Sequence, residues 1–357
     1  MSANTITART LIEQVMRDGR SIADEYPTVF GACASGGLVT VEEAGELRAA
    51  CAIQPRDLVA GAARLRIGLV GSVVTDPAHQ NQGWGTRLLA AAEDALRQDG
   101  CVLALLWADD RGFYARRGWR EIGCERDFIV SRENVDALPA ATDCRAANEG
   151  DACSIHALYL LHDRRVERLE LETAELLHCP GMEVLVHEER GRVDAYACLG
   201  RGRDLPNVVH EWGGASDGVL RLLRAHVERR TARGIDDELY VMAPGAHGEV
   251  QGRIALAGVP SAVGVLGMGK LLDAEGLARA CAEVLGPRGV VRARAVDRGQ
   301  VEFRGPRGLC VVTHDALLDI AVAARGERGA ARELALALGV EVRDLPMNPF
   351  VWGLDSI

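Results

Sequence analysis

Apolar and polar positions follow one order along the first third of the chain. The pattern predicts a helix at 9–23, then a hairpin whose second strand, 47–53, is almost entirely apolar. A mainly apolar strand, Ile67–Thr75, is stopped by Asp76-Pro77, and a glycine-bearing loop leads into a helix at Thr86–Gln98. The first predicted unit ends with a strand at 102–107, a short aromatic helix at 113–117 and a last strand at 128–130.

The order hairpin, strand, glycine turn, helix, strand returns between residues 144 and 242 with little sequence identity, which we interpret as a duplicated fold. From about Gly264 the pattern changes to a helix, three short strands and two helices. The sequence therefore predicts an α/β (α+β) chain with domains at 1–139, 140–262 and 263–357.

Composition narrows the class of protein. Hydrophobic residues make up 48% and charged residues 26% of the chain, as in ordinary globular proteins. The 41 basic and 51 acidic residues give a net charge of −10, which argues against a nucleic-acid partner. The ten cysteines include no CxxC pair, so we expect free thiols and no metal site. The sequence shows no signal-peptide or membrane-span pattern, so we expect a cytoplasmic protein without a membrane partner.

The loop before the second predicted helix carries the clearest chemical signal. It reads Gln80-Asn81-Gln82-Gly83-Trp84-Gly85, between a strand and a helix N-terminus. Free amide groups and the positive end of the helix dipole favour an anion there, and glycines let the backbone approach a pyrophosphate. The spacing matches neither a nucleotide-hydrolysing P-loop nor the GxGxxG dinucleotide motif.

Two segments together resemble a known family. Residues 80–85 match Q/R-x-x-G-x-G/A, the acyl-CoA motif of the GNAT acetyltransferases. Some 29 residues later, Phe113-Tyr114-Ala115-Arg116-Arg117-Gly118-Trp119 is similar to that family's second signature, FYxxxGF. Strand, loop, helix, strand and aromatic helix also occur in the family's order. The resemblance implies two tandem GNAT-like mixed-sheet units, the first of which binds acetyl-CoA as cosubstrate.

The resemblance also implies roles for particular residues. The pantetheine is expected along Val73, Val74 and Thr75, and the pyrophosphate at Gln80 and at the amides of Asn81, Gln82, Gly83, Trp84, Gly85 and Thr86. A backbone N–H of Val74 or Thr75 would stabilise the developing oxyanion, and Tyr114 would protonate the departing thiolate. Many relatives place arginines before the first glycine; here these are absent, so Arg87 is a candidate for neutralising charge. The Trp84 side chain is either a cofactor contact or core.

The second unit lacks the acyl-CoA motif. After its central strand the sequence reads His210-Glu211-Trp212-Gly213-Gly214, so we predict a degenerate copy that does not bind CoA. We expect His210 and Glu211 to be solvated at the strand end, and Arg164 and Glu188 to lie on solvated faces.

Two GNAT-like units followed by a small α/β unit resemble the enhanced-intracellular-survival group of this family. There the third unit is similar to sterol carrier protein and the C-terminal carboxylate is the catalytic base, a role that would fall to Ile357. The apolar segment 347–354 fits this expectation.

The predicted function is therefore acetyl transfer from acetyl-CoA to an amine of a small molecule or peptide by direct attack on the thioester. A homo-oligomer is a further expectation from the group. The alternatives are a non-catalytic CoA-binding regulatory protein, suggested by the arginine-poor loop, and a lipid carrier, suggested by the third unit alone.

Overall fold

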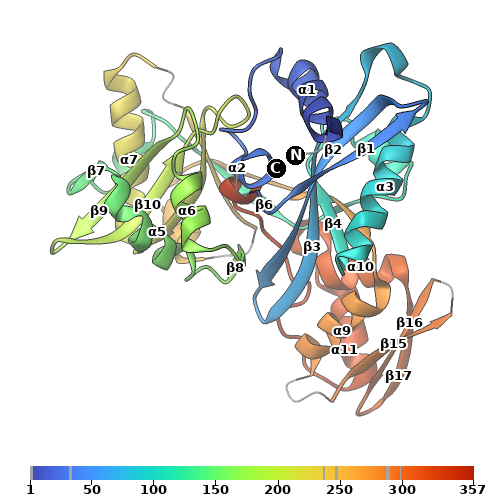
Figure 1. Ribbon diagram of the computed structural model, residues 1–357. Coiled ribbons are helices and arrows are strands. Elements are labelled where there is room, and N and C mark those ends of the chain that lie inside the picture. The colour runs from blue at the N-terminus through green and yellow to red at the C-terminus, as the bar shows by residue number, and fades with distance from the viewer. Residues whose placement is uncertain (1–2, 32–33, 236–237, 246–247, 287–289, 298) are drawn as a thin grey trace. The chain divides into compact units, whose positions relative to one another are not determined.

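The computed structural model describes all residues except 1–2, 32–33, 236–237, 246–247, 287–289 and 298. The chain forms two compact units, each built from separate segments (Figure 1). The first unit contains residues 1–123, 265–349 and 357. The second contains residues 124–264 and 350–356.

The first unit has a mixed sheet in the order β1-β2-β3-β4-β14-β5. Its N-terminal elements are α1 (Ala3–Arg17), α2 (Pro27–Phe30), β1 (Gly37–Glu43), β2 (Glu46–Ala60), β3 (Ala63–Thr75), α3 (Trp84–Gln98), β4 (Leu103–Leu106), α4 (Arg111–Ala115) and β5 (Arg120–Ile122). Each helix and strand that the pattern predicts up to residue 117 is present, with ends shifted by a few residues. The largest shifts are at α1, which begins and ends six residues earlier than predicted, and at β2, which ends at Ala60, seven residues later than predicted.

Strand β2 explains why its sequence is apolar without alternation. Ala49, Cys51 and Ile53 pack against α3, whereas Ala50 and Ala52 pack against α1. Successive strand residues point to opposite faces, so a strand covered on both faces needs apolar residues at every position.

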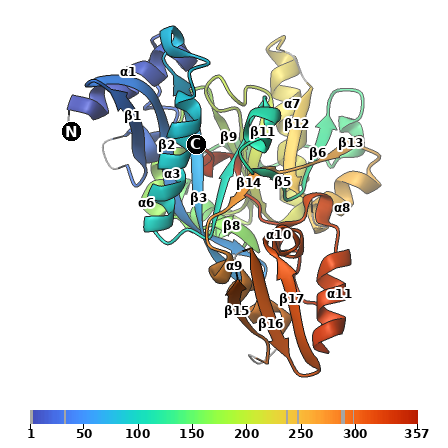
Figure 2. The same cartoon turned by 90° about the vertical axis from the view of Figure 1, so that its right-hand side faces the viewer.

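The C-terminal part of the first unit does not begin a new sheet, because its first strand completes the old one. Strand β14 pairs with both β4 and β5. The sequence pattern predicted no strand at the residues of β14. The other strands form a separate antiparallel sheet, β15-β16-β17, beside α10 and α11 (Figure 2). The elements are β14 (Gly267–Leu271), α9 (Ala274–Leu285), β15 (Arg292–Asp297), β16 (Gln300–Gly305), β17 (Gly308–Thr313), α10 (His314–Val322) and α11 (Gly329–Leu338). Their likeness to sterol carrier protein and the predicted domain limits stay predictions.

The second unit has a sheet in the order β13-β6-β12-β11-β10-β9-β7. The strand expected to close the first sheet, β6, belongs here instead, paired with β12 and β13. The elements are β6 (Glu125–Val130), β7 (Cys144–Ala146), α5 (Ala152–Tyr159), β8 (Arg164–Val166), α6 (Glu170–Leu176), β9 (Glu183–Glu189), β10 (Arg192–Leu199), β11 (Val208–Gly214), α7 (Ser216–Ala232), β12 (Leu239–Pro244), α8 (Glu249–Leu256) and β13 (Ser261–Gly264). The repeat of hairpin, strand, helix and strand is thus present as β9, β10, β11, α7 and β12.

The expectation of solvated polar residues in the second unit is wrong at three positions. His210 and Glu211 on β11 are fully buried, and Arg164 is buried as well. Polar residues at a strand end were assigned to solvent because burying them requires partners, which the sequence does not display. Glu211 is paired with Arg168, which lies 43 residues earlier in the chain.

Nine cysteines, all except Cys33, lie among the described residues and are free thiols. No helix in the described part of the chain has the length and apolar character needed to cross a membrane.

Acid should destabilise the protein through His210. Its ring nitrogen Nε2 lies 3.0 Å from the carbonyl oxygen of Gly200, and burial lowers the pKa of His210 to about 3. As the pH falls below the ordinary histidine pKa of about 6.5, the unfolded chain binds the proton first. Stability should therefore be constant above that pH and fall below it, by up to about 1.4 kcal/mol per pH unit for this group.

Urea unfolding at pH 7.5, 6 and 5 measures this effect. His210→Gln, which keeps an N–H donor for Gly200, should make the loss of stability with falling pH shallower. The same change at His178, which is exposed, should leave the slope unaltered. Equal slopes for wild type and His210→Gln would contradict the assignment.

Candidate active site

Strands β3 and β4 diverge and open the edge of β3. Their parallel pairing covers only Ile67–Leu69 opposite Leu103–Leu105. From Val70 to Thr75, β3 stays paired with β2 on its other side, and no described strand pairs with it on the β4 side. Backbone donors and acceptors of this edge are therefore available to an extended ligand.

A bulge interrupts β3 within this open segment. Ala50 pairs with Val74 and Ala52 with Gly71, so the two residues Ser72 and Val73 stand opposite Cys51 alone. Ser72 has a φ of 50°, in the left-handed region that few residues other than glycine adopt. Such a bulge turns backbone groups away from the ladder, a device common beside active sites.

The predicted phosphate loop lies where β3 leads into α3. Gly83 is the N-cap of α3 with a φ of 85°, and no described atom lies within 4 Å of where its Cβ would stand. Asn81 is also left-handed, with a φ of 60°. The first amides of a helix have no acceptor within that helix, so the loop offers donors at the positive end of the dipole.

Trp84 and Gly85, the next two residues of the motif, have different structural roles. The Trp84 side chain is 4% exposed and belongs to the core beneath α3, so it is a core residue and not a cofactor contact. Only its backbone amide is then available to a ligand. Gly85 accommodates the second motif, since a Cβ there would lie 3.1 Å from Cζ of Phe113. The two sequence motifs are thereby in contact.

The second motif forms α4, which holds Tyr114. The Asp110 carboxylate caps this helix by accepting from the Phe113 amide at 3.1 Å. The Tyr114 ring makes edge contacts with Phe113 and Trp119, at centroid distances of 5.0 and 6.0 Å. Burial raises the pKa of Tyr114 to about 12, so its hydroxyl carries a proton at neutral pH.

Arginines of the second motif supply the charge that the first motif lacks. Arg117 donates from Nε and Nη2 to Oγ1 of Thr86, at 2.9 and 2.6 Å, and its guanidinium lies 3.7 Å from the Phe113 ring centroid. Arg116 lines the same cavity. Arg87, our candidate from the sequence, instead stacks on Trp84 and does not line the cavity. The sequence signal for this positive charge is the pair Arg116-Arg117 that follows Tyr114-Ala115, to which the sequence analysis assigned no role.

A cavity of about 810 Å³ joins these features. Nine of the predicted residues line it: Val73, Thr75, Gln80, Asn81, Gly83, Trp84, Gly85, Thr86 and Tyr114. Val74, Gln82 and Ile357 are not part of the lining. Val74 points to the opposite face of β3, into the core beneath α1. The open strand edge, the glycine loop and two arginines fit an extended ligand with an anionic end. Nowhere in the described residues do three metal-binding side chains converge.

Ile357 lies close to the bulge although it does not line the cavity. A Cβ on Gly71 would overlap the backbone oxygen and carbonyl carbon of Ile357. Gly71 itself lines the cavity, and Ile357 packs against the core cluster beneath α1 to which Val74 belongs.

In the second unit, polar contacts within the protein are made at the corresponding place. Strands β11 and β12 also diverge early, since their pairing covers only Val208 and Val209. Beyond this point the Trp212 indole N–H donates to the carbonyl of Met242 at 2.8 Å, across the diverging strands. At the start of α7, Asp217 pairs with Arg221 and Arg253 at 2.7 and 2.9 Å. An acidic residue bound to two arginines thus occupies this helix start.

Comparisons with known proteins agree with this geometry. Residues 12–122, about a third of the chain, match the family model of the acetyltransferase (GNAT) domain. No curated protein sequence matches. Among solved structures, a conserved protein of Enterococcus faecalis V583 has a TM-score of 0.71 at 11% identity, and a GCN5-related N-acetyltransferase of Kribbella flavida 0.64 at 16%. Eis1 of Mycobacterium abscessus has a TM-score of 0.58 at 16% identity.

These similarities extend over whole chains. Each covers 100% of this chain and 97% or 98% of the other. At such identities they establish a shared fold. Residues 12–122 therefore form a GNAT acetyltransferase domain, and the full chain shares its fold with these solved structures, Eis1 included. Domains of this family transfer an acyl group from acetyl-CoA.

Gly83→Ala should weaken acetyl-CoA binding, because a Cβ would project into the space that a pyrophosphate needs. Gly100→Ala is a matched control: it stands at the other end of α3, with a φ of 75° and free space around its Cβ position. Both changes should cost about 1 kcal/mol of stability through the left-handed backbone. Only Gly83→Ala should reduce affinity, and Gly83→Trp should abolish it.

Isothermal titration calorimetry measures both quantities. We expect one acetyl-CoA per chain, since Trp212 and Asp217 make polar contacts within the protein at the second unit's corresponding place. A stoichiometry of two, or equal affinity for the two alanine variants, would contradict this assignment.

Proposed function

We propose that the protein is an N-acetyltransferase that moves the acetyl group of acetyl-CoA to an amine of a small molecule or peptide by direct attack on the thioester. The observation that carries the proposal is a single cavity lined by an open strand edge, a helix N-terminus and Tyr114. Each of these three features supplies something that the reaction needs.

The open edge of β3 holds the cosubstrate. Backbone groups between Val73 and Thr75 pair with the pantetheine as an added strand would. The amides from Asn81 to Thr86 receive the pyrophosphate, with Gln80 and Gln82 beside them. Arg116 and Arg117 add positive charge there, which removes the main reason for expecting a protein that binds CoA poorly.

The bulge and Tyr114 act on the thioester. A backbone N–H of Val74 or Thr75, aimed by the bulge, donates to the oxygen on which negative charge develops, a role typically worth about 3 kcal/mol. Tyr114 gives its proton to the departing thiolate. Its raised pKa keeps the hydroxyl protonated across the neutral range.

The Ile357 carboxylate is the base that we propose for the attacking amine. An alkyl amine titrates near pH 10 and arrives mostly as ammonium, so a proton must be removed before attack. The close approach of Ile357 to Gly71 supports this role, because the absent side chain of Gly71 makes room for it. Asp109 and Asp110 also line the cavity, and Asp110 is the next candidate.

Release of free thiol from acetyl-CoA tests the activity, with benzylamine, 1,5-diaminopentane and triglycine as the amine panel. Amine-dependent release supports the enzyme. Tight CoA binding without turnover would instead favour a regulatory protein, and lipid that co-purifies would favour a carrier. A cytoplasmic location and a homo-oligomer remain predictions.

Tyr114→Phe should keep acetyl-CoA affinity but lower kcat by roughly 10²–10⁴-fold, the range for loss of a general acid. Tyr26→Phe is the control, because Tyr26 packs in the core beneath α1, away from the cavity. Steady-state kinetics under conditions where chemistry limits the rate provide the measurement. Unchanged kcat would remove Tyr114 from the mechanism.

Displacing the Ile357 carboxylate should slow the reaction. Two glycines added after Ile357 move the carboxylate while leaving its apolar anchor, and Gly71→Ala pushes it away from the bulge. Each variant should lower kcat at neutral pH by about tenfold or more, with the loss recovered at high pH, where the amine is already neutral. A folded extended variant with native kcat would sink the assignment and make Asp110→Asn the next test.

A further inference from the structure

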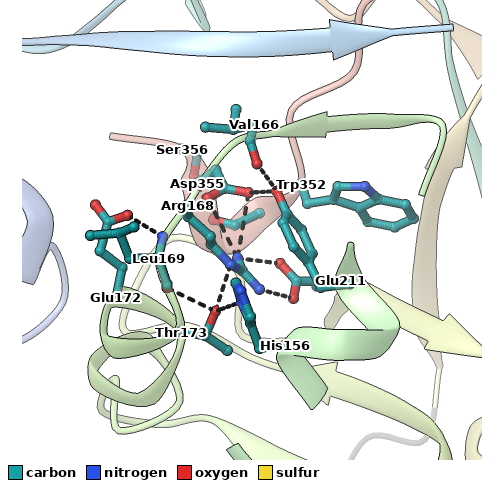
Figure 3. Close-up of polar contacts among 12 residues, drawn as sticks. His156, Val166, Arg168, Leu169, Glu172, Thr173, Glu211, Trp352, Asp355 and Ser356 are labelled. Atoms are coloured by element: carbon teal, nitrogen blue, oxygen red, sulfur yellow. Dashed lines mark hydrogen bonds and ion pairs between the residues drawn. The ribbon is translucent and has the colours of Figure 1, made fainter. Parts of the chain in front are cut away.

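A buried charge cluster in the second unit holds the segment that ends at Ile357 (Figure 3). Arg168 donates from Nη2 to Oε1 of Glu211 at 2.6 Å and from Nη1 to Oε2 at 2.9 Å. The Asp355 carboxylate lies 3.4 Å from the same Nη1. The side chains of all three residues are 0% exposed. Arg168 thus links a residue of β11 to a residue near the end of the chain.

Tyr159 completes the contact with Asp355. Its hydroxyl is 2.7 Å from Oδ2 of Asp355 and 2.8 Å from the carbonyl oxygen of Val166, so two acceptors share one proton. Its ring lies 3.6 Å from the guanidinium carbon of Arg168. On the other side of the cluster, the Tyr196 hydroxyl donates to Oε1 of Glu211 at 3.0 Å. Each buried carboxylate therefore contacts one tyrosine hydroxyl, and the two share Nη1 of Arg168.

Other contacts fix the backbone around Asp355. The Trp352 indole donates to the carbonyl of Arg164 at 3.0 Å. Arg201 donates to the carbonyl oxygen of Ser356 at 3.1 Å and also to that of Gly353. Gly353 has no room for a side chain, because a Cβ there would overlap His210. The segment 352–356 is thus held by its backbone as well as by its carboxylate.

The charged contacts of Asp355 fix the position of segment 352–356 along its binding surface, which apolar packing alone would not do. A buried ion pair contributes little net stability over apolar residues of similar size, but removal of one partner is costly. An apolar segment can slide by a residue and still be buried, whereas Asp355 meets Arg168 and Tyr159 in one position. Two residues separate Asp355 from Ile357, and a chain spans at most about 3.6 Å per residue. When Asp355 is fixed, the α-carbon of Ile357 can therefore lie no more than about 7 Å from that of Asp355.

We propose that Arg168, Tyr159 and Asp355 are positioning residues that hold the Ile357 carboxylate at the acetyl-transfer site. The inference rests on the proposed role of that carboxylate as base. None of the three touches the reacting atoms; they act through the last two residues of the chain.

Asp355→Ala tests the clamp while leaving Arg168 paired with Glu211 and the Tyr159 hydroxyl bonded to Val166. Two readouts are taken on the full chain. The first is the rate at which a carboxypeptidase releases Ile357, followed by mass spectrometry. The second is the pH profile of kcat and KM with acetyl-CoA and the panel amine that gives the highest turnover. We expect release at least tenfold faster, kcat at least tenfold lower and an unchanged KM for acetyl-CoA. The rate should keep rising toward high pH.

A matched pair covers the case in which Asp355→Ala does not fold. Tyr159→Phe and Tyr196→Phe each remove one buried hydroxyl from a carboxylate that contacts Arg168, but only Tyr159 contacts the tail. Tyr159→Phe should speed the release of Ile357 and lower kcat, whereas Tyr196→Phe should do neither, even at equal loss of stability.

The outcomes separate this inference from the proposed function. If Ile357 stays protected in Asp355→Ala and Tyr159→Phe, the clamp is wrong, and the glycine extension still tests the base. If the tail is released but kcat and its pH profile are native, positioning is overturned and the base assignment fails with it. If Tyr159→Phe and Tyr196→Phe change the release of Ile357 and kcat equally, the cluster contributes only to stability and the positioning role is contradicted.

Discussion

The divergence of β3 from β4 after Leu69 is the constraint on which the proposed chemistry depends. Two parallel strands that stayed paired would satisfy each other's backbone groups and leave no edge for a ligand. Because they part, the cavity forms between them, the bulge at Ser72 and Val73 faces it, and the N-terminus of α3 lies at its end. The second motif then closes the wall with Tyr114 and two arginines.

The second unit has the same topology, but a side chain crosses the gap between its diverging strands. Its strands β11 and β12 also part, but Trp212 spans the gap to Met242, and Asp217 brings two arginines to the helix start. The unit has instead acquired a buried polar interior around Arg168. The first copy thus has the cavity beside its open strand, and the second has a buried charge cluster that contacts the chain's last segment.

Local sequence was enough for the predicted elements up to residue 117 and for most of the residues that line the cavity. Periodicity located α3, β3 and the hairpins, since these depend on contacts close in sequence. The glycine loop and the tyrosine segment were recognisable because a phosphate site needs backbone geometry that only certain residues permit. The order of elements also indicated the family's fold. Each element and each motif is a local signal, and the order of elements is their succession along the chain.

Tertiary structure alone decided where strands and charges end up. The sequence could not show that β14 completes the first sheet or that β6 joins the second, because strand pairing depends on partners more than 100 residues away. Nor could it show that Glu211 is buried: a carboxylate is excluded from a core unless a cation meets it, and the cation here, Arg168, is 43 positions distant. Burial of charge is a property of the assembled set, and no member of the set reveals it by itself.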